Sequence, residues 1–352
     1  QVLGVMSGTS LDGIDLCLSS FVLGASWEFQ ITTAKTVEYS EKWKYRLRSA
    51  IDLNPTALEK LNKDYTRFLA DVIQAFIRTH GHHKIDAVCS HGHTVFHEPN
   101  AGKTLQIGNL PILATYLNQT VVCDFRTQDV ALGGQGAPLV PIGDALLFSE
   151  YDYCLNLGGF ANISFEQNFE RTAFDVCPVN IVLNHYVASL GKQYDSEGQI
   201  ASKGSVCKPL LEALNALEFY KQHPPKSLGL EWVQSQIFPL IESYNLEVPI
   251  LLRTVVEHCA VQLSIILNNN HLKKGLSTGG GVFNSFLMQR ISALCGCDLQ
   301  PENSMIIEFK EALIFGFLGV LKLRNETNCL QSVTGAIHDH SSGCIYFPEK
   351  KQ

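Results

Sequence analysis

The chain opens with a short apolar run that passes directly into a loop of glycine and hydroxyl residues. Residues 2–6 suit a strand that is buried on both faces, and the loop starts at residue 7. Residues 14–19 alternate between apolar and polar, which predicts a second strand joined to the first by a hairpin connection. Asp12 and Asp15 then lie at the mouth of this hairpin.

Apolar periodicity predicts the other elements. A spacing of three and four apolar positions indicates helices, and short apolar runs bounded by turn residues indicate strands. The predicted helices cover residues 43–53, 56–80, 181–187, 250–268, 286–291 and 306–323. The predicted strands cover residues 29–37, 85–90, 120–125, 153–157, 160–164, 172–175 and 276–278, with a return strand within 332–346. Residues 91–99 are expected to form a polar turn, and Pro178 is expected in the first turn of a helix.

This order of elements is typical of an α/β fold with mixed sheets. Residues 153–164 repeat the arrangement of the first hairpin, with a strand, a glycine turn and a strand, which indicates a duplicated architecture. The pattern changes after residue 125, where a stretch rich in glycine and proline covers residues 131–141. We therefore expect one domain from residues 1–125 plus 327–352, and a second from residues 126–326.

Composition narrows the class of protein. The 352 residues are 45% hydrophobic, enough for two cores, and the net charge of −7 without basic runs disfavours nucleic-acid binding. No apolar run is expected to span a membrane, and no signal-peptide pattern is seen, so we expect a cytoplasmic protein. The eleven cysteines are scattered without a CxxC motif, which favours reduced, buried thiols.

Three glycine turns each follow an apolar strand, at Gly8, at Gly158 and Gly159, and at Gly279 to Gly281. Glycine lets the backbone approach a ligand closely, and successive N–H groups bind phosphate oxygens. Two such turns facing each other would clamp a polyphosphate, with the third beside the base and sugar of a nucleotide. The alternative is three unrelated tight turns without a ligand.

Asp175 and Arg126 are candidates for chemistry at strand ends. Asp175 precedes a predicted helix, where its carboxylate would act either as a general base in a cleft or as a helix N-cap. Arg126 and Asp129 flank another strand end. An arginine there would bind an anionic substrate through two hydrogen bonds, or the two residues would form a structural salt bridge.

His91, His93 and His97 share one face of an extended segment, so a zinc site is one hypothesis for them. We favour His91 and His93 as hydrogen-bonding groups in a sugar pocket. Cys295 and Cys297 are expected to be a buried loop pair, because a structural zinc site needs further ligands at recognisable spacing.

Motifs along the whole chain resemble those of the anhydro-N-acetylmuramic acid kinase family. They are MSGTSLDGID at residues 6–15, SHG at 90–92, DFR at 124–126, GGQGAPLVP at 133–141, NLGGFANI at 156–163, PPKS at 224–227, GGG at 279–281 and VTGA at 333–336. The resemblance implies the hexokinase and actin superfamily fold: two related α/β domains, ribonuclease H-like and with mixed sheets, flanking a nucleotide cleft.

The family's reaction uses ATP, Mg²⁺ and water to open the anhydro sugar released from peptidoglycan and to phosphorylate its 6-oxygen. By resemblance, Asp175 is the catalytic base that deprotonates the attacking water. The sugar contacts are His91, Arg126, Asp129 and Glu311. The nucleotide contacts are Gly8, Thr9, Ser10, Leu11, Asp12, Gly13, Ile14, Asp15, Gly158, Gly159, Asn162, Gly279, Gly280 and Gly281, with Mg²⁺ held near Asp12. The partners implied are the sugar and ATP, in a homodimer.

The sequence departs from the family at the loop after Asp175. The family commonly has two glycines where this chain has Cys177 and Val179, so the loop must adopt ordinary backbone angles. His93 replaces the usual Gln, and Asn184 the usual Asp. Since Asp175 is retained, we expect activity. The alternatives are a catalytically impaired member that binds nucleotide or sugar, and a metal-dependent hydrolase built on the three histidines.

Overall fold

The computed structural model describes residues 1–8, 10–80, 84–297, 299 and 303–349. Two compact units divide the chain. Unit 1 comprises Gln1–Leu147 and Phe309–Gln352, and unit 2 comprises Phe148–Glu308. Each has its own sheet and its own hydrophobic core.

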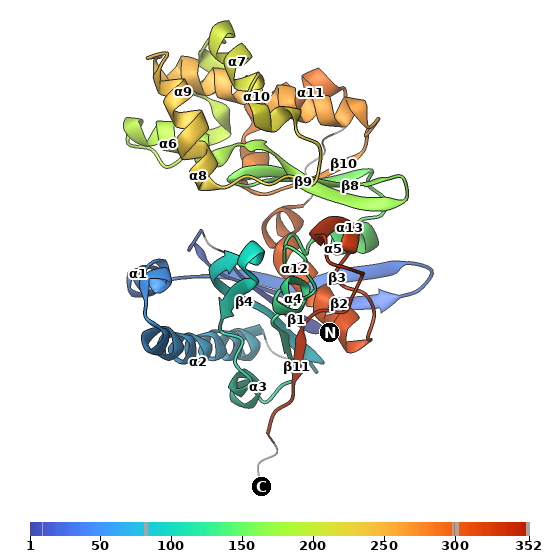
Figure 1. The fold of residues 1–352 in the computed structure, drawn as a ribbon. Coiled ribbons are helices and arrows are strands. Elements are labelled where there is room, and N and C mark those ends of the chain that lie inside the picture. The colour runs from blue at the N-terminus through green and yellow to red at the C-terminus, as the bar shows by residue number, and fades with distance from the viewer. Residues whose placement is uncertain (9, 81–83, 298, 300–302, 350–352) are drawn as a thin grey trace. The chain divides into compact units, whose positions relative to one another are not determined.

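Unit 1 is built on a seven-stranded sheet (Figure 1) with the order β11-β6-β4-β1-β2-β3, and β5 pairs with β4. Its strands are β1 (Val2–Ser7), β2 (Gly13–Leu23), β3 (Trp27–Glu38), β4 (Ala87–Glu98), β5 (Lys103–Ile107), β6 (Val121–Cys123) and β11 (Cys344–Tyr346). Its helices are α1 (Glu41–Arg48), α2 (Pro55–His80), α3 (Ile112–Leu117), α4 (Thr127–Ala131), α5 (Pro141–Leu147), α13 (Gln331–Thr334) and most of α12 (Ser304–Leu323).

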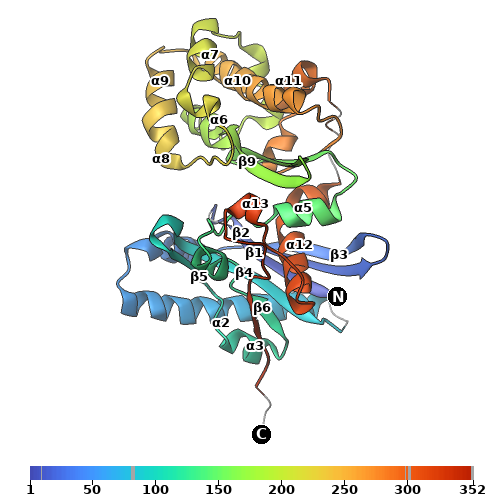
Figure 2. The same cartoon turned by 45° about the vertical axis from the view of Figure 1, so that its right-hand side comes forward.

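Unit 2 has a four-stranded sheet with the order β10-β7-β8-β9, of which Figure 2 labels β9. Its strands are β7 (Tyr153–Leu157), β8 (Phe160–Gln167), β9 (Glu170–Pro178) and β10 (Gly275–Thr278). Its helices are α6 (Asn180–Val187), α7 (Lys208–Asn215), α8 (Leu230–Trp232), α9 (Phe238–Glu242), α10 (Val248–Asn269) and α11 (Ser285–Cys295).

The two sheets share one topology, which confirms the predicted duplication. In unit 1, β1, β2 and β3 form an antiparallel meander, and β4 lies parallel to β1 on its other side. In unit 2, β7, β8 and β9 form the same meander, and β10 lies parallel to β7. A glycine-containing turn follows the first strand of each meander, so the two turns occupy equivalent places.

Helices α2 and α12 account for the packing of unit 1. Apolar residues of α2, such as Tyr65 and Ile73, are buried with Leu3 and Val5 of β1. Helix α12 also lies directly on the sheet, since a Cβ atom on Gly4 would overlap the backbone of Ala312. The absence of a side chain at Gly4 therefore permits this close approach.

The domain boundaries that we predicted, 125/126 and 326/327, differ from the division between the units. Residues 126–147 and 309–326 lie in unit 1. The physical reason is that α12 packs on the first sheet, where Phe317 also contacts Phe21 and Trp27. We predicted α12 to be the last helix of the second domain, because its apolar pattern does not indicate which sheet the helix packs against.

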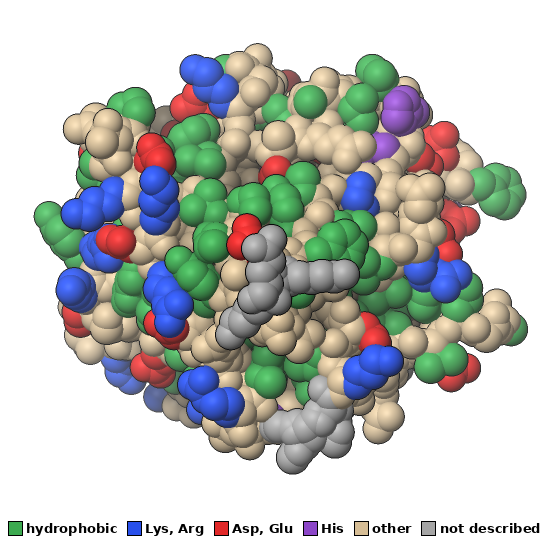
Figure 3. Space-filling model, turned by 90° about the horizontal axis from the view of Figure 1, so that it is seen from below, with side chains coloured by type: hydrophobic (Ala, Val, Ile, Leu, Met, Phe, Trp, Pro, Cys, Tyr) green, Lys and Arg blue, Asp and Glu red, His purple; other side chains and the backbone are tan. Residues whose placement is uncertain are grey.

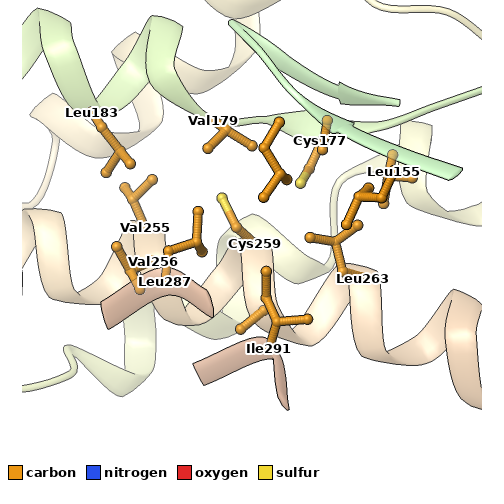
Figure 4. Packing of buried hydrophobic residues seen from close by; sticks show 14 of the residues in the cluster. Leu155, Cys177, Val179, Leu183, Val255, Val256, Cys259, Leu263, Leu287 and Ile291 are labelled. Atoms are coloured by element: carbon orange, nitrogen blue, oxygen red, sulfur yellow. The ribbon is translucent and has the colours of Figure 1, made fainter. Parts of the chain in front are cut away.

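The core of unit 2 lies between its sheet and α10 (Figure 4). Helix α10 is long and apolar enough to cross a membrane by length and composition, contrary to our expectation for the sequence, and most of it is buried in unit 2. Buried residues cover most of its circumference, among them Leu252, Val256 and Leu263. A core helix of this kind is apolar on nearly all sides.

Two local predictions were wrong. Residues 91–98 do not form a polar turn but continue β4, because β5 pairs with them from Lys103 to Ile107. Pro178 is the last residue of β9, and α6 starts at Asn180.

The outer surface of the molecule is mixed in character. Figure 3 shows hydrophobic side chains among lysines, arginines and acidic residues on one face. A groove of about 600 Å³ in unit 1 is lined in part by Leu110, Ile112, Tyr346 and Phe347. Phe347 is 69% exposed, so this groove carries accessible apolar surface.

Candidate active site

Asp175 lies in β9 of unit 2 and is partly buried. Its Oδ2 atom accepts a hydrogen bond of 2.8 Å from the backbone N–H of Leu228, and its own N–H donates to the carbonyl of Lys226 at 3.1 Å. The segment after Pro225 therefore holds Asp175 from both its backbone and its side chain. Burial raises the pKa of the carboxyl, and the hydrogen bond from Leu228 opposes this shift.

A row of polar residues crosses the sheet of unit 2 at the level of Asp175. Asp175 is opposite Asn162 in β8, Asn162 is opposite Asn156 in β7, and Asn156 is opposite Thr278 in β10. Cross-strand neighbours have Cβ atoms about 4.5–5.5 Å apart. Asp175 and Asn162 were predicted site residues, whereas Asn156 and Thr278 were not, because their only signal is a polar residue placed just before a glycine turn.

The two glycine turns of unit 2 lie beside this row. Gly279 has a φ of 84°, and a Cβ atom there would lie 2.5 Å from Oδ1 of Asn156. A Cβ atom on Gly281 would meet Leu157, which immediately precedes Gly158. Gly159 and Gly280 are exposed. The structure thus brings together the second and third predicted glycine turns, with accessible backbone in each.

The first hairpin of unit 1 joins β1 to β2 over residues 8–12, and Thr9 lies outside the described residues. Ser10 and Asp12 are exposed, whereas the side chains of Leu11 and Ile14 are buried. Gly13 is also buried, and a Cβ atom there would meet the carbonyl of Val37. Leu11, Gly13 and Ile14 therefore shape the hairpin, and the polar groups offered to a ligand belong to residues nearer its tip.

Asp15 and Asp12 differ in their surroundings. The Oδ1 atom of Asp15 accepts a hydrogen bond of 2.6 Å from the hydroxyl of Thr36, its neighbour on β3. Asp12 keeps an exposed carboxylate at the end of the hairpin. Carboxylate oxygen suits Mg²⁺, a hard cation, so the residues present fit the predicted metal near Asp12.

A buried chain of hydrogen bonds lies beneath this hairpin. The hydroxyl of Ser7 lies 2.6 Å from that of Tyr39 and 3.0 Å from Nδ1 of His93, and the Tyr39 hydroxyl lies 2.6 Å from that of Tyr65. Burial lowers the pKa of His93 to about 4, so its imidazole is neutral at physiological pH. Ser7 was expected at the start of the loop, but its hydrogen-bonded chain with Tyr39 and Tyr65 could not be predicted, because the partners are far apart along the chain.

His91 and Arg126 form a directed pair in unit 1. The Nε atom of Arg126 donates to Nε2 of His91 at 2.8 Å, so the proton of the neutral ring is on Nδ1, which lies 2.9 Å from the carbonyl of Gly92. Burial lowers the pKa of His91 far below its usual value, and the charge of Arg126 lowers it further. The Nη1 atom of Arg126 donates to the carbonyl of Gly136 at 2.7 Å. His91 therefore orients the guanidinium group.

Glu311 lies in α12 close enough to Arg126 for the two charges to interact. The pKa of its carboxyl is raised, first by the protein packed around it and then by Asp15, while Arg126 opposes the shift. The side chain nevertheless retains exposed surface. The structure thus brings together His91, Arg126 and Glu311 in unit 1.

Asp129 does not face an open site. It is fully buried, and its Oδ2 atom accepts a hydrogen bond of 2.6 Å from the backbone N–H of Gly136. Its Oδ1 atom accepts from the hydroxyl of Thr334 at 2.7 Å. The predicted sugar contact is therefore replaced by a supporting role, since the carboxylate fixes the loop that accepts a hydrogen bond from Arg126.

The three histidines do not gather around one point. Nδ1 of His93 faces Ser7, Nδ1 of His97 faces the hydroxyl of Thr104 at 2.9 Å, and His91 faces Arg126. Gly92 has a φ of 75°, which breaks the regular alternation of the strand. Within the described part of the chain, the histidines are not among the groups placed to hold a metal, so the zinc hypothesis for them was wrong.

The cysteine predictions are confirmed. All eleven cysteines are free, and most are buried. Cys295 and Cys297 are both buried around the end of α11, where the N–H of Cys297 lies 3.2 Å from the sulfur of Cys295.

The two residues that stand in place of the family's glycines after Asp175 fill the core of unit 2. Cys177 and Val179 have no exposed surface, and both lie among the apolar side chains above α10 (Figure 4). Val179 has a φ of −123°, and Cys177 is not among the residues with positive φ. Neither residue therefore uses a positive φ, but the ψ of −93° at Val179 lies outside the usual helical and extended ranges, so the prediction of ordinary backbone angles was wrong there. The two side chains pack into the interior.

The repeated topology and the glycine turns define the chain as a member of the actin and hexokinase-like class of sugar kinases. Among solved structures, the xylulose kinase from Lactobacillus acidophilus aligns with a TM-score of 0.45 and 12% identity, covering 99% of this chain and 94% of that chain. The model of the family "Anhydro-N-acetylmuramic acid kinase" matches residues 1–348. The chain belongs to the anhydro-N-acetylmuramic acid kinase family.

Relatives of full length carry the same family name. Anhydro-N-acetylmuramic acid kinase from Mannheimia succiniciproducens is 35% identical over 373 residues, covering 98% of both chains. That from Vibrio cholerae is 32% identical over 370 residues, covering 99% of this chain and 98% of its own.

Proposed function

We propose that this protein is an ATP-dependent kinase of peptidoglycan recycling. It opens 1,6-anhydro-N-acetylmuramic acid with water and phosphorylates the 6-oxygen, giving N-acetylmuramic acid 6-phosphate and ADP. The observation that carries this proposal, beside membership of the family, is the setting of Asp175. One carboxylate oxygen is fixed by the N–H of Leu228, and no hydrogen bond within the described residues occupies the other.

Asp175 acts as the general base. Its Oδ1 atom takes a proton from water as the water oxygen bonds to the anomeric carbon. The bond from that carbon to the bridging 6-oxygen breaks, and its electron pair stays on the 6-oxygen. The 6-oxygen then bonds to the γ-phosphorus of ATP, and the bond to ADP breaks. A raised pKa suits this role, because it makes the carboxylate a stronger base.

Each unit offers its own groups to ATP. In unit 1, we assign Gly8, Ser10 and Asp12 to the phosphates through the backbone and exposed side chains of the hairpin, and Asp15 supports that hairpin. Mg²⁺ held near Asp12 would offset the charge of the phosphates. We retain Thr9 as a contact from the family motif.

In unit 2, we assign the nucleotide contacts to the exposed backbone of Gly159 and Gly280, with the neighbouring glycines at positions 158, 279 and 281. Asn162, in the row with Asp175, completes this set. Glycine in both turns leaves room for a ligand beside the peptide groups.

Arg126 and Glu311 bind the sugar, with His91 orienting the guanidinium group. A carboxylate-bearing sugar suits Arg126, because hydrogen bonds from a charged guanidinium group to a carboxylate are stronger than neutral ones. Nε and Nη1 of Arg126 are occupied within the protein, and no hydrogen bond within the described residues uses Nη2. Nη2 therefore remains for the substrate.

A labelling experiment tests the proposal. The protein is incubated with ATP, Mg²⁺ and the anhydro sugar in ¹⁸O-water, and the product is analysed by mass spectrometry. We expect ¹⁸O at C1 and the phosphoryl group on the 6-oxygen. Sugar-independent ADP release, or product without label at C1, would refute the coupled reaction. We also propose a cytoplasmic homodimer, and sedimentation equilibrium at micromolar protein tests the dimer.

A further inference from the structure

A second cluster of chemically active side chains lies in unit 1. Asp129, Cys329 and His340 are 0%, 1% and 6% exposed. One potential ligand atom from each lies within 4.8 Å of the others. The mechanism proposed above assigns no reacting atom to any of them.

The backbone places two of the three side chains. Cys329 and His340 are opposite each other in an isolated antiparallel bridge. Each donates its N–H to the carbonyl of the other at 3.1 Å. Directly opposed residues of such a pair project their side chains on the same side, so the bridge sets the thiol and the imidazole next to each other.

The imidazole of His340 has a fixed orientation. Its Nδ1 atom lies 3.1 Å from the carbonyl oxygen of His338 and donates a proton to it, since a carbonyl only accepts. In the neutral ring, Nε2 then carries a lone pair. Nε2 lies 3.5 Å from Oδ1 of Asp129, is buried, and has no hydrogen-bond partner among the described residues. A buried lone pair aimed at a carboxylate oxygen is satisfied by a proton or by a metal ion between the two atoms.

We propose that Asp129, Cys329 and His340 bind a structural zinc ion. Zinc favours this mixture of sulfur, nitrogen and oxygen donors, and bonds of about 2.0–2.3 Å in a tetrahedron place neighbouring ligand atoms roughly 3.3–3.6 Å apart. The sulfur of Cys329 lies 3.1 Å from Oδ1 of Asp129, and Nε2 of His340 lies 3.5 Å from it. The carboxylate and a thiolate balance the charge of Zn²⁺, and the fourth position is left to water or to the hydroxyl of Thr334.

Binding replaces the proton of the Cys329 thiol with the metal. Without metal, the thiol donates to Asp129, and burial and the neighbouring carboxylate raise its pKa. Zinc therefore displaces one proton to solvent on binding, and loading weakens as pH falls.

The zinc ion would join three segments behind Arg126. Asp129 accepts the N–H of Gly136, whose carbonyl accepts a hydrogen bond from Arg126. The N–H of Gln135 also donates to the carbonyl of Thr334 at 2.7 Å, in the segment between Cys329 and His340. The metal would thus hold the 129–136 loop against the C-terminal segment.

The test is metal loading during refolding. The full chain is unfolded in guanidinium with reductant and chelator, then refolded with Zn²⁺ or Co²⁺. We expect one metal per chain by atomic emission and a thiolate-to-cobalt charge-transfer band. Cys329→Ser and His340→Gln should lose the band, the stoichiometric metal and the rise in melting temperature given by zinc. Cys207→Ser, which alters a partly buried thiol in unit 2, should retain all three.

Two results would overturn the proposal: a refolded wild-type chain that retains no metal, and a folded His340→Gln variant that binds as the wild type does. Circular dichroism establishes whether each variant folds. If both ligand variants fail to fold, X-ray absorption on the wild-type cobalt protein decides. One sulfur and one imidazole in the coordination shell support the site, and a shell without sulfur refutes it.

Discussion

Val179 offers a quantitative test of how the departure after Asp175 is accommodated. It is fully buried, and it packs near Leu183, Val255 and Cys259 (Figure 4). Val179→Ala removes two carbons, which costs about 1.6 kcal/mol in transfer free energy and about 2 kcal/mol with the cavity. Val179→Gly restores the family's residue but removes a third carbon; its added backbone freedom is partly offset by relief of the unusual ψ of −93° at this position, for a total of roughly 3 kcal/mol.

The assay is thermal and urea unfolding of the two variants beside the wild type, with kcat measured on the folded fraction. For a unit of this size, each kcal/mol lowers the melting temperature by about 2–4 °C, so Val179→Gly should melt about 10 °C below the wild type. Because the side chain points into the core, kcat for Val179→Ala should stay close to the wild-type value. A glycine variant as stable as the wild type would refute the packing argument.

Three further predictions concern the proposed site and the fold. Asp175→Asn should abolish turnover and leave ATP binding, measured by calorimetry, intact. The melting temperature of this variant should match that of the wild type at acidic pH and exceed it at neutral pH. The reason is that the pKa of the Asp175 carboxyl is raised in the folded protein, so the wild type loses stability as pH rises through that pKa. A melting difference that does not depend on pH would contradict this reasoning. His91→Ala should lower kcat/KM for the sugar by roughly 10–100-fold, mainly through KM, because Arg126 loses its acceptor; an unchanged KM would exclude the orienting role. Gly4→Ala should cost about 2–3 kcal/mol in urea unfolding by pushing against α12, whereas Gly280→Ala, with open space around its Cβ, should be nearly neutral for stability.

Much of the fold could be predicted because the deciding signals are local. The spacing in α2 is set by burial of one face, and the helix is present as expected. The strand β2 is also present as expected, although Cys17 and Ser19 on its second face are buried too. The extension of β4 through Glu98 could not be predicted in this way, because it depends on pairing with β5. The assignment of α12 to the first sheet depends likewise on a contact with Gly4, more than three hundred positions away.

The candidate site likewise contains residues that could be predicted from local sequence and residues that could not. Asp175 and the glycine turns stand out because their residue types carry the chemistry. Asp129 was misassigned as a sugar contact, since a sequence does not reveal whether a carboxylate faces solvent or the backbone N–H of Gly136. The hydrogen bond between Ser7 and Tyr39 could not be predicted, because it joins the end of β1 to a residue just after β3.

The insertion of unit 2 between the two parts of unit 1 has a consequence for synthesis. Unit 2 is continuous in sequence, from Phe148 to Glu308, so all of it emerges from the ribosome before residues 309–352 emerge. Until then, unit 1 lacks β11 and the part of α12 that lies against Gly4. The inserted unit can therefore complete its core first, while the apolar face of the earlier unit stays open to chaperones and to misassembly.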